Sequence, residues 1–181
     1  VIFNLSRNQK LIYNDVRKFG FIKFIKKINL EQNLHLKNLG QETVEEKFNF
    51  TYFKKYILGR NRMIKDILMD QKFVSGLGNI YVNEILFFSS IKPTKKVKDL
   101  LDSEIKKIIK FNKIILLRAI ALGGSSIKDF SSSNGKKGLF QQRFSVYGKK
   151  GEKCSKKNCN SNIIKILIAN RASFYCDKCQ K

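Results

Sequence analysis

The sequence predicts an α+β protein with a β-rich beginning, a helical middle and a β-hairpin at the end. Three observations support this prediction. β-Branched and aromatic residues gather in short runs within residues 1–25. Apolar residues recur at helical spacing from about residue 43 to residue 122. Two close pairs of cysteines enclose two further apolar runs near the end of the 181-residue chain, which is long enough to bury a core.

The β-rich beginning contains three predicted strands. Residues 1–5 and 10–13 form the first two, and the polar residues 6–9 between them have the composition of a hairpin turn. Residues 14–20 interrupt the pattern with turn-forming residues, and residues 21–25 resume it as a third strand. Three strands are few for an independent sheet, so we expect them to belong to a larger one.

The helical middle is organised around a glycine corner. Residues 48–57 form one predicted amphipathic helix, and residues 63–68 form the helix before the corner. Gly76 and Gly78 give the corner its backbone freedom, and the next helix starts at Asn79 or one residue before it. A helix start presents unpaired N–H groups that bind anions, phosphate above all. The alternative is a helix-turn-helix corner with ordinary capping and no ligand.

A long helix follows, and less regular segments come after it. Its apolar stripe runs through residues 99–122, and Gly123 with Gly124 is a typical helix end. Residues 125–138 are polar and read as a linker or a mobile loop. Residues 144–147 are predicted to form a short strand.

The charge of the chain points to a polyanionic partner. The formal net charge is +23, from 37 basic and 14 acidic residues, and neutralising phosphates releases counterions from nucleic acid. The alternative is compositional, because an AT-rich genome also enriches lysine. The arginines are therefore more informative than the lysines, since guanidinium matches phosphates and base edges. The sequence has no apolar run long enough to span a membrane and no signal peptide, so we expect a cytoplasmic protein.

The four cysteines have the spacing of a metal site. Four residues separate the first pair, two separate the second, and sixteen lie between the pairs. Two predicted strands, residues 163–168 and 172–175, would bring the pairs together, with residues 169–171 as their turn and Arg171 exposed on it. Four thiolates complete a tetrahedral shell, so the sequence predicts one structural Zn²⁺ ion; a disulfide would need an oxidising compartment. The predicted ligands are Cys154, Cys159, Cys176 and Cys179.

Five separated segments resemble one family, the bacterial formamidopyrimidine-DNA glycosylases, in matching order and spacing. They are residues 15–20 (DVRKFG), 70–84 (DQKFVSGLGNIYVNE), 122–130 (LGGSSIKDF), 146–152 (VYGKKGE) and 171–181 (RASFYCDKCQK). The resemblance implies a remnant of an N-terminal β-sandwich over residues 1–40 and a helix–two-turn–helix domain over residues 41–130. Residues 131–181 would then hold a lesion-covering loop and a Cys₄ zinc finger.

The resemblance implies base-excision repair of double-stranded DNA that contains oxidised purines, namely 8-oxoguanine and formamidopyrimidines. Such enzymes flip the damaged nucleotide out of the duplex. The amine of an N-terminal proline forms a Schiff base at the sugar, a glutamate handles protons, and β,δ-elimination cleaves the backbone. We expect a monomer that associates with the bacterial nucleoid by binding DNA.

The resemblance also implies roles for individual residues. Arg17 and Phe19 match the loop that enters the duplex and fills the gap left by the flipped base. The complete predicted DNA-binding set is Arg17, Lys18, Phe19, Lys72, Gly78, Asn79 and Arg171. The segment that covers the everted base contributes Ser125, Ser126, Lys136 and Phe140.

The sequence departs from the family pattern in four places. Val16 stands where proline is usual, Lys18 stands where a second arginine is usual, and the first cysteine pair has a spacing of four instead of two. The Pro-Glu start is not among these residues, and the only proline is the internal Pro93. We therefore expect this chain alone to bind DNA without cleaving it. Two alternatives remain open: an endonuclease VIII-type enzyme for oxidised pyrimidines, and a non-catalytic DNA-binding module.

Overall fold

The computed structural model describes residues 1–15, 18–125 and 138–181. The chain divides into two compact units, Val1–Lys37 and Asn38–Lys181. The second unit contains both the helices and the C-terminal hairpin, so the further division predicted between residues 130 and 131 stays a prediction. No helix in the described part of the chain has the length and apolarity needed to cross a membrane.

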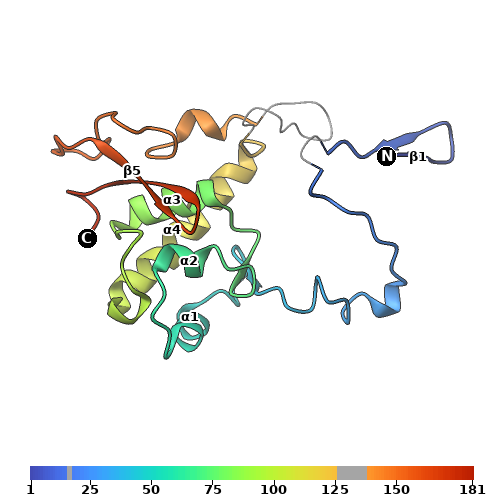
Figure 1. The fold of residues 1–181 in the computed structure, drawn as a ribbon, viewed down its shortest axis with the longest axis horizontal. Coiled ribbons are helices and arrows are strands. Elements are labelled where there is room, and N and C mark those ends of the chain that lie inside the picture. Colours follow the sequence, from blue (N-terminus) through green and yellow to red (C-terminus); the bar gives the residue numbers. More distant parts are fainter. Residues whose placement is uncertain (16–17, 126–137) are drawn as a thin grey trace. The chain divides into compact units, whose positions relative to one another are not determined.

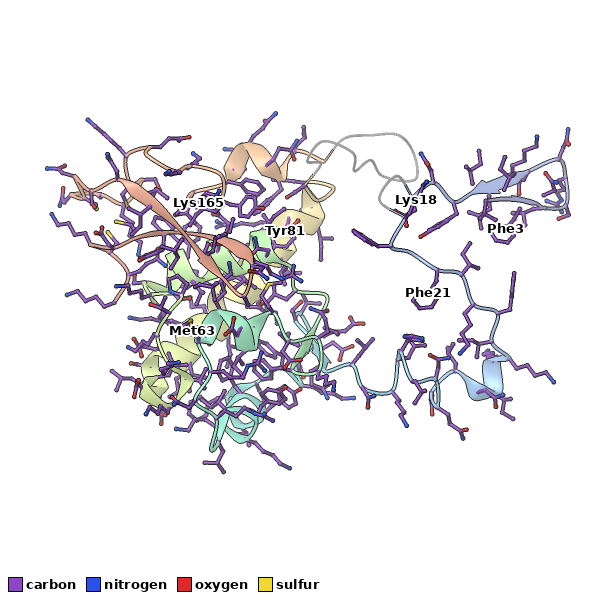
Figure 2. All side chains as sticks on the ribbon, viewed as in Figure 1. Phe3, Lys18, Phe21, Met63, Tyr81 and Lys165 are labelled. Atoms are coloured by element: carbon purple, nitrogen blue, oxygen red, sulfur yellow. The ribbon has the colours of Figure 1, made fainter. Side chains whose placement is uncertain are left out.

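The first unit contains one β-hairpin. Strands β1 (Ile2–Asn4) and β2 (Lys10–Ile12) pair antiparallel, as predicted from the turn between them. The predicted third strand at residues 21–25 is wrong, because no described strand pairs with this segment. Phe21 stands on a single extended stretch of chain (Figure 2) and is 64% exposed. Residues 21–25 have a composition that favours a strand, but no neighbouring strand within the described ranges supplies the backbone hydrogen bonds that a strand needs. A short helical turn, η1 (Lys27–Asn29), follows.

The helices of the second unit confirm the periodicity argument (Figure 1). Their bounds are α1 (Phe50–Ile57), α2 (Ile64–Leu68), α3 (Asn79–Ser89) and α4 (Asp102–Ala121), with a short turn η2 (Val97–Asp99) ahead of α4. The Asn49 side chain caps α1 by accepting a hydrogen bond from the Tyr52 amide at 3.0 Å. The long helix ends as predicted, since Gly123 and Gly124 both have positive φ angles, 72° and 80°.

The corner before α3 is braced by one side chain. Two short parallel strands, β3 (Gln41–Glu42) and β4 (Val74–Ser75), bring the chain to the turn. Gln71 accepts a hydrogen bond from the Gly76 amide and donates one to the Leu77 carbonyl, each at 2.9 Å. Gly76 has a φ of 78°, a conformation that glycine adopts without strain. These hydrogen bonds therefore fix the direction in which α3 leaves the turn.

The core lies around α3, which packs against both α4 and the C-terminal hairpin. Ahead of the corner, the fully buried ring of Phe73 packs against other aromatic rings with centroid separations of 4.4–5.6 Å. Those rings belong to Phe48, Tyr52, Phe53 and Tyr56. Aromatic packing of this kind fixes α1 against the corner.

The C-terminal part confirms one predicted hairpin and corrects one predicted strand. Strands β5 (Ile163–Ile168) and β6 (Arg171–Cys176) pair antiparallel, following the turn η3 (Phe140–Arg143). The predicted strand at residues 144–147 is wrong. Its amides at 145, 146 and 147 donate to the buried Glu84 carboxylate on α3, at 2.8, 3.0 and 2.9 Å. A side chain has taken the place of a neighbouring strand.

Candidate nucleic-acid interface and metal centre

The first turn of α3 is open to an anion. Gly78 precedes the helix in an extended conformation, and Asn79 is its first residue, as predicted. No acidic side chain lies in this turn, so the positive end of the helix dipole is not neutralised there. The Gly78 position has open space where a Cβ would stand. This turn can therefore accept a phosphate at close range.

Side chains of the helical domain bind the free edge of β6. A strand edge carries unpaired backbone groups that must find partners when buried. The Ala172 carbonyl accepts from Asn79 Nδ2 at 3.0 Å and from Lys65 Nζ at 2.9 Å. The Phe174 amide donates to Asn83 Oδ1 at 2.6 Å. Asn79 and Asn83 thus replace a neighbouring strand and fix the hairpin to the start of α3.

The far end of the same edge is closed by the last residues of the chain. Gln180, only 1% exposed, accepts from the Cys176 amide through Oε1, and its own backbone amide donates to the Cys176 carbonyl, both at 3.0 Å. Its side-chain amide also donates to the Ile91 carbonyl at 2.8 Å, just after α3. The hairpin is therefore attached to both ends of α3.

Arg171 lies at the start of β6 and is exposed. The prediction placed it in the turn, but the turn consists of Ala169 and Asn170, both with positive φ (46° and 58°), and Arg171 pairs with Ile168. The hydrogen bond from Asn79 to Ala172 places Arg171 one residue from the α3 start. The structure thus brings together two predicted DNA-binding residues that are 92 positions apart in the sequence.

Lys65 is a buried cation next to these groups, and it is not among the residues predicted from the sequence. The side chain is 1% exposed, and Nζ donates to the Ser173 hydroxyl at 2.5 Å as well as to Ala172. Burial, with a smaller contribution from the positive charge of Arg171, lowers the pKa of Lys65 to about 8. Asn83 and Glu84 were missed as well. The available signal was a polar or charged residue within an otherwise apolar helical stretch.

The four cysteines form a compact cluster, as predicted. Their sulfur atoms all lie within 4.8 Å of one another and none forms a disulfide. The Sγ atoms of Cys154 and Cys179 are 3.9 Å apart, and those of Cys159 and Cys176 are 3.6 Å apart. Two of the four residues are buried. Four convergent sulfurs are a donor set that could hold a metal ion, and this set fits tetrahedral Zn²⁺.

The other predicted DNA-binding residues are exposed or lie outside the description. Lys72 is exposed, and its amide donates to the Asp70 carboxylate at 3.1 Å. In the first unit, Phe19 is 80% exposed and Lys18 has a φ of 56°. Asp15 braces their loop by accepting from the amides at 18 and 20, at 3.1 and 2.6 Å. Arg17 lies outside the described residues.

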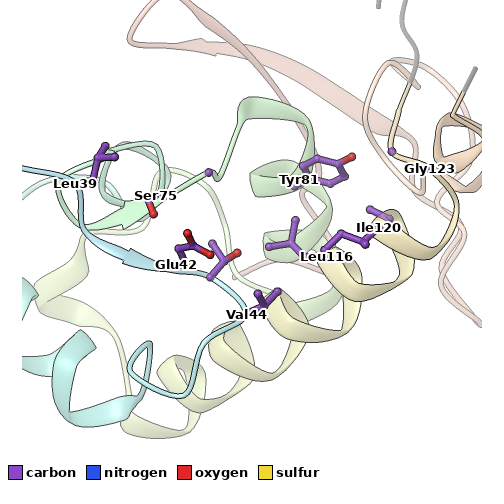
Figure 3. Close-up of a pocket in the computed structure, with 12 residues that line it drawn as sticks. Leu39, Glu42, Val44, Ser75, Tyr81, Leu116, Ile120 and Gly123 are labelled. Atoms are coloured by element: carbon purple, nitrogen blue, oxygen red, sulfur yellow. The ribbon is translucent and has the colours of Figure 1, made fainter. Parts of the chain in front are cut away.

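The ends of the predicted lesion loop are anchored beside a pocket. Ser125 bridges Leu139, and the Phe140 amide donates to the Gly124 carbonyl at 3.1 Å. Tyr81 Oη lies 3.2 Å from Ser125 Oγ and contributes to a pocket of about 700 Å³ (Figure 3). The pocket is largely apolar, with Leu116 and Ile120 of α4 on one side (Figure 3). The other predicted loop residues, Ser126 and Lys136, lie outside the described residues.

Comparisons with known proteins agree on one family. Residues 39–131, about half of the chain, match the formamidopyrimidine-DNA glycosylase H2TH domain. The formamidopyrimidine-DNA glycosylase of Rickettsia bellii is 42% identical over all 181 residues, and that of Rickettsia massiliae is 42% identical over 180 residues. This chain covers 65% and 63% of those two relatives, so it spans a little under two thirds of their length.

Solved structures of the same family share the fold. The Lactococcus lactis Fpg in complex with DNA containing an abasic site aligns with a TM-score of 0.88 and 38% identity, over 97% of this chain and 64% of that one. The MutM (Fpg) protein of Thermus thermophilus aligns with a TM-score of 0.88 and 30% identity, over 96% and 65%. The chain belongs to the formamidopyrimidine-DNA glycosylase family.

Proposed function

We propose that this chain is the DNA-binding part of a base-excision repair glycosylase and AP lyase that removes oxidised purines from double-stranded DNA. The observation that carries the proposal is the attachment of the Arg171 hairpin to the start of α3 through Asn79 and Ala172. Relatives with the same fold are described in complexes with Fapy-dG-containing and 8-oxo-G-containing DNA. Bound to DNA, the protein would reside in the cytoplasm at the nucleoid.

The proposed grip on DNA uses two phosphate-binding elements held at a fixed spacing. The α3 start offers backbone amides at Gly78 and Asn79, and Arg171 offers a guanidinium on the adjacent hairpin. Lys72, exposed just ahead of the corner, adds a third positive group. One Zn²⁺ ion on the four cysteines would keep the far end of β6 folded, because metal binding contributes directly to the stability of such small modules.

The proposed intercalating loop consists of Arg17, Lys18 and Phe19. An exposed phenyl ring on a short loop suits insertion into the base stack, where apolar wedges kink the duplex. The hydrogen bonds to Asp15 restrict the loop before DNA binds, so insertion would cost less conformational entropy. A flipped purine would enter the pocket beside Tyr81, with residues 125–140 as its cover, and the apolar walls suit a flat aromatic base.

The proposed chemistry belongs to the longer protein. The family resemblance assigns the nucleophile to a terminal proline amine, whereas Pro93 is internal, so its nitrogen is a tertiary amide without nucleophilic character. We therefore propose that these 181 residues bind damaged duplex DNA but form no Schiff base. A longer chain that begins with Pro-Glu would do both.

Borohydride trapping on an 8-oxoguanine duplex tests the proposal. Borohydride reduces the Schiff base to a stable covalent adduct, which runs as a larger species on a denaturing gel. We expect no adduct with the 181 residues alone and an adduct with a chain that carries the Pro-Glu start. The absence of an adduct with the longer chain would contradict the glycosylase assignment, and preferential trapping on an oxidised-pyrimidine duplex would favour the endonuclease VIII type.

A further inference from the structure

A second cleft lies between α2, with the residues next to it, and the turn of the β5–β6 hairpin. Its volume is about 420 Å³. Arg62 and Lys65 come from the helical side, and Ile168, Ala169 and Arg171 come from the hairpin. Two carboxylates, Asp66 and Asp70, complete the charged lining. Three cations against two carboxylates leave the cleft with a net positive charge.

The Lys65 ammonium has no carboxylate partner among the described residues. There it donates to the Ala172 carbonyl and the Ser173 hydroxyl, both uncharged. A buried cation is costly without a counter-charge, and the nearby guanidinium of Arg171 increases that cost. Asp66 on the same helix offsets it only in part, since the pKa of Lys65 remains low at about 8. An anion in the cleft would complete the compensation.

Arg62 is already oriented at the edge of this cleft. It donates through Nη1 to the Asp70 carboxylate at 2.9 Å and through Nη2 to the Asp66 carbonyl at 3.2 Å. Asp70 is fully engaged, because it also accepts from Tyr56 Oη and the Lys72 amide. Burial opposes the charge on Asp70, but these hydrogen bonds outweigh burial and lower its pKa. A guanidinium has five N–H donors, so Arg62 retains donors for a further partner.

We propose that the cleft between Arg62 and Arg171 is a second phosphate subsite, which binds a DNA backbone phosphate next to the one held at the α3 start. This inference rests on the proposed DNA-binding function and extends it. The phosphate contacts the two guanidinium groups, and Lys65 lies beneath them as a buried counter-charge. Arg171, the first residue of β6, then contacts the phosphates of both subsites.

Proton uptake is the distinctive consequence. The titratable and charged groups near the Lys65 ammonium are Arg62, Asp66 and Asp70 on the α2 side and Arg171 on β6, while α3 contributes the uncharged amides of Asn79 and Asn83. A bound phosphate favours the charged form of Lys65 and raises its pKa. DNA binding therefore takes up a proton near pH 8, and affinity falls as pH rises above it.

Fluorescence anisotropy with a duplex that carries a stable abasic analogue tests the subsite. Arg62→Gln removes one phosphate-binding group, so the slope of log K against log salt should become shallower by about 0.9, with a several-fold weaker Kd. Arg62→Lys keeps the charge and should retain most of the slope. Arg60→Gln is the matched control, because the Arg60 guanidinium stacks on Tyr56, 4.3 Å from the ring centroid, outside the cleft.

The pH dependence of Kd provides the second readout. The wild-type protein should lose affinity as pH rises through about 8 to 9, by up to about tenfold for each unit by which DNA raises the Lys65 pKa. Lys65→Met should show a flatter profile, provided that its circular dichroism spectrum confirms folding. Identical salt slopes for the Arg62→Gln and Arg60→Gln variants would overturn the subsite. Loss of binding by Arg171→Ala with no effect of Arg62→Gln would refute the subsite alone, whereas no duplex binding by the wild type would refute the proposed function.

Discussion

Glu84 holds residues 145–147, which follow the predicted lesion loop, and its removal should release that segment. The carboxylate is 1% exposed and accepts three backbone hydrogen bonds. Ser145 donates to Oε2, whereas Val146 and Tyr147 both donate to Oε1. The two oxygens thus have different partners, and this difference allows a graded test.

The expected magnitudes follow from burial. Val146 is fully buried, so its unpaired amide would cost about 2 kcal/mol, and the half-buried amides of Ser145 and Tyr147 about 1 kcal/mol each. Glu84→Ala should therefore destabilise the segment by about 4 kcal/mol. Glu84→Gln keeps one acceptor oxygen for Val146 and Tyr147 but turns an NH₂ group toward the Ser145 amide, so we expect a loss of about 2 kcal/mol.

Native-state hydrogen exchange measures this locally, without assuming that the whole chain unfolds in one step. In Glu84→Gln, exchange of the Ser145 amide should accelerate more than exchange of the Val146 amide. Glu46→Gln, a change at an exposed glutamate, is the control and should leave all three rates unchanged. If Glu84→Gln protects all three amides as well as the wild type does, the carboxylate does not hold this segment.

Three further outcomes are expected. A chelator, or Cys176→Ala, should unfold β5 and β6, because thiolate ligation of a metal contributes to folding. Bound metal, measured by atomic absorption, and the near-ultraviolet circular dichroism signal should fall together. A hairpin that stays ordered without metal would contradict this expectation. Lys65→Met should change the pH dependence of stability. The pKa of Lys65 in the folded protein, about 8, is below the ordinary lysine value of 10.5, so the unfolded chain binds more protons between these two pH values. Denaturant titrations should therefore show the wild type gaining stability relative to Lys65→Met as pH rises from 8 to 10.5, by at most about 3 kcal/mol. A pH-independent difference would count against the buried charge. Asn83→Leu should leave the Phe174 amide unpaired and cost about 2 kcal/mol in hairpin protection by hydrogen exchange, while Asn83→Asp, which still accepts from that amide, should cost less; equal protection in all three proteins would exclude the role of Asn83.

Local signals predicted most of the fold. The C-terminal end of α4 follows from Gly123 and Gly124, and the turn ahead of α3 follows from Gly76, because all three glycines have positive φ angles. The β1–β2 hairpin follows from its polar turn. The cysteine spacing predicted the cluster because ligand spacing is itself a local pattern. These features depend on neighbours within a few residues, which a sequence displays directly.

Long-range pairing between side chains and the backbone was not predictable. Residues 144–147 have strand composition, but nothing in the sequence says that Glu84, about 60 positions earlier, would take their amides. The position of Arg171 was misjudged for another reason. Ala169 adopts a positive φ that alanine rarely takes, so the two-residue turn gave no glycine signal. The burial of Lys65 was not predicted because lysine is usually exposed, and this chain contains many lysines.

Salt-dependent binding to the abasic-analogue duplex tests the central claim, that Arg171 and the α3 start form one phosphate-binding face. Arg171→Ala and Asn79→Ala should each weaken binding. Arg171→Ala should make the salt slope shallower by about 0.9 for each phosphate that Arg171 neutralises in the wild type, and Lys107→Ala on the exposed face of α4 should have a smaller effect. Because the Asn79 side chain also holds the hairpin at Ala172, the two substitutions should be less than additive when combined. An unchanged salt slope for Arg171→Ala would contradict the claim. So would losses of affinity for Arg171→Ala and Asn79→Ala that are no larger than that for Lys107→Ala and that add when the two substitutions are combined.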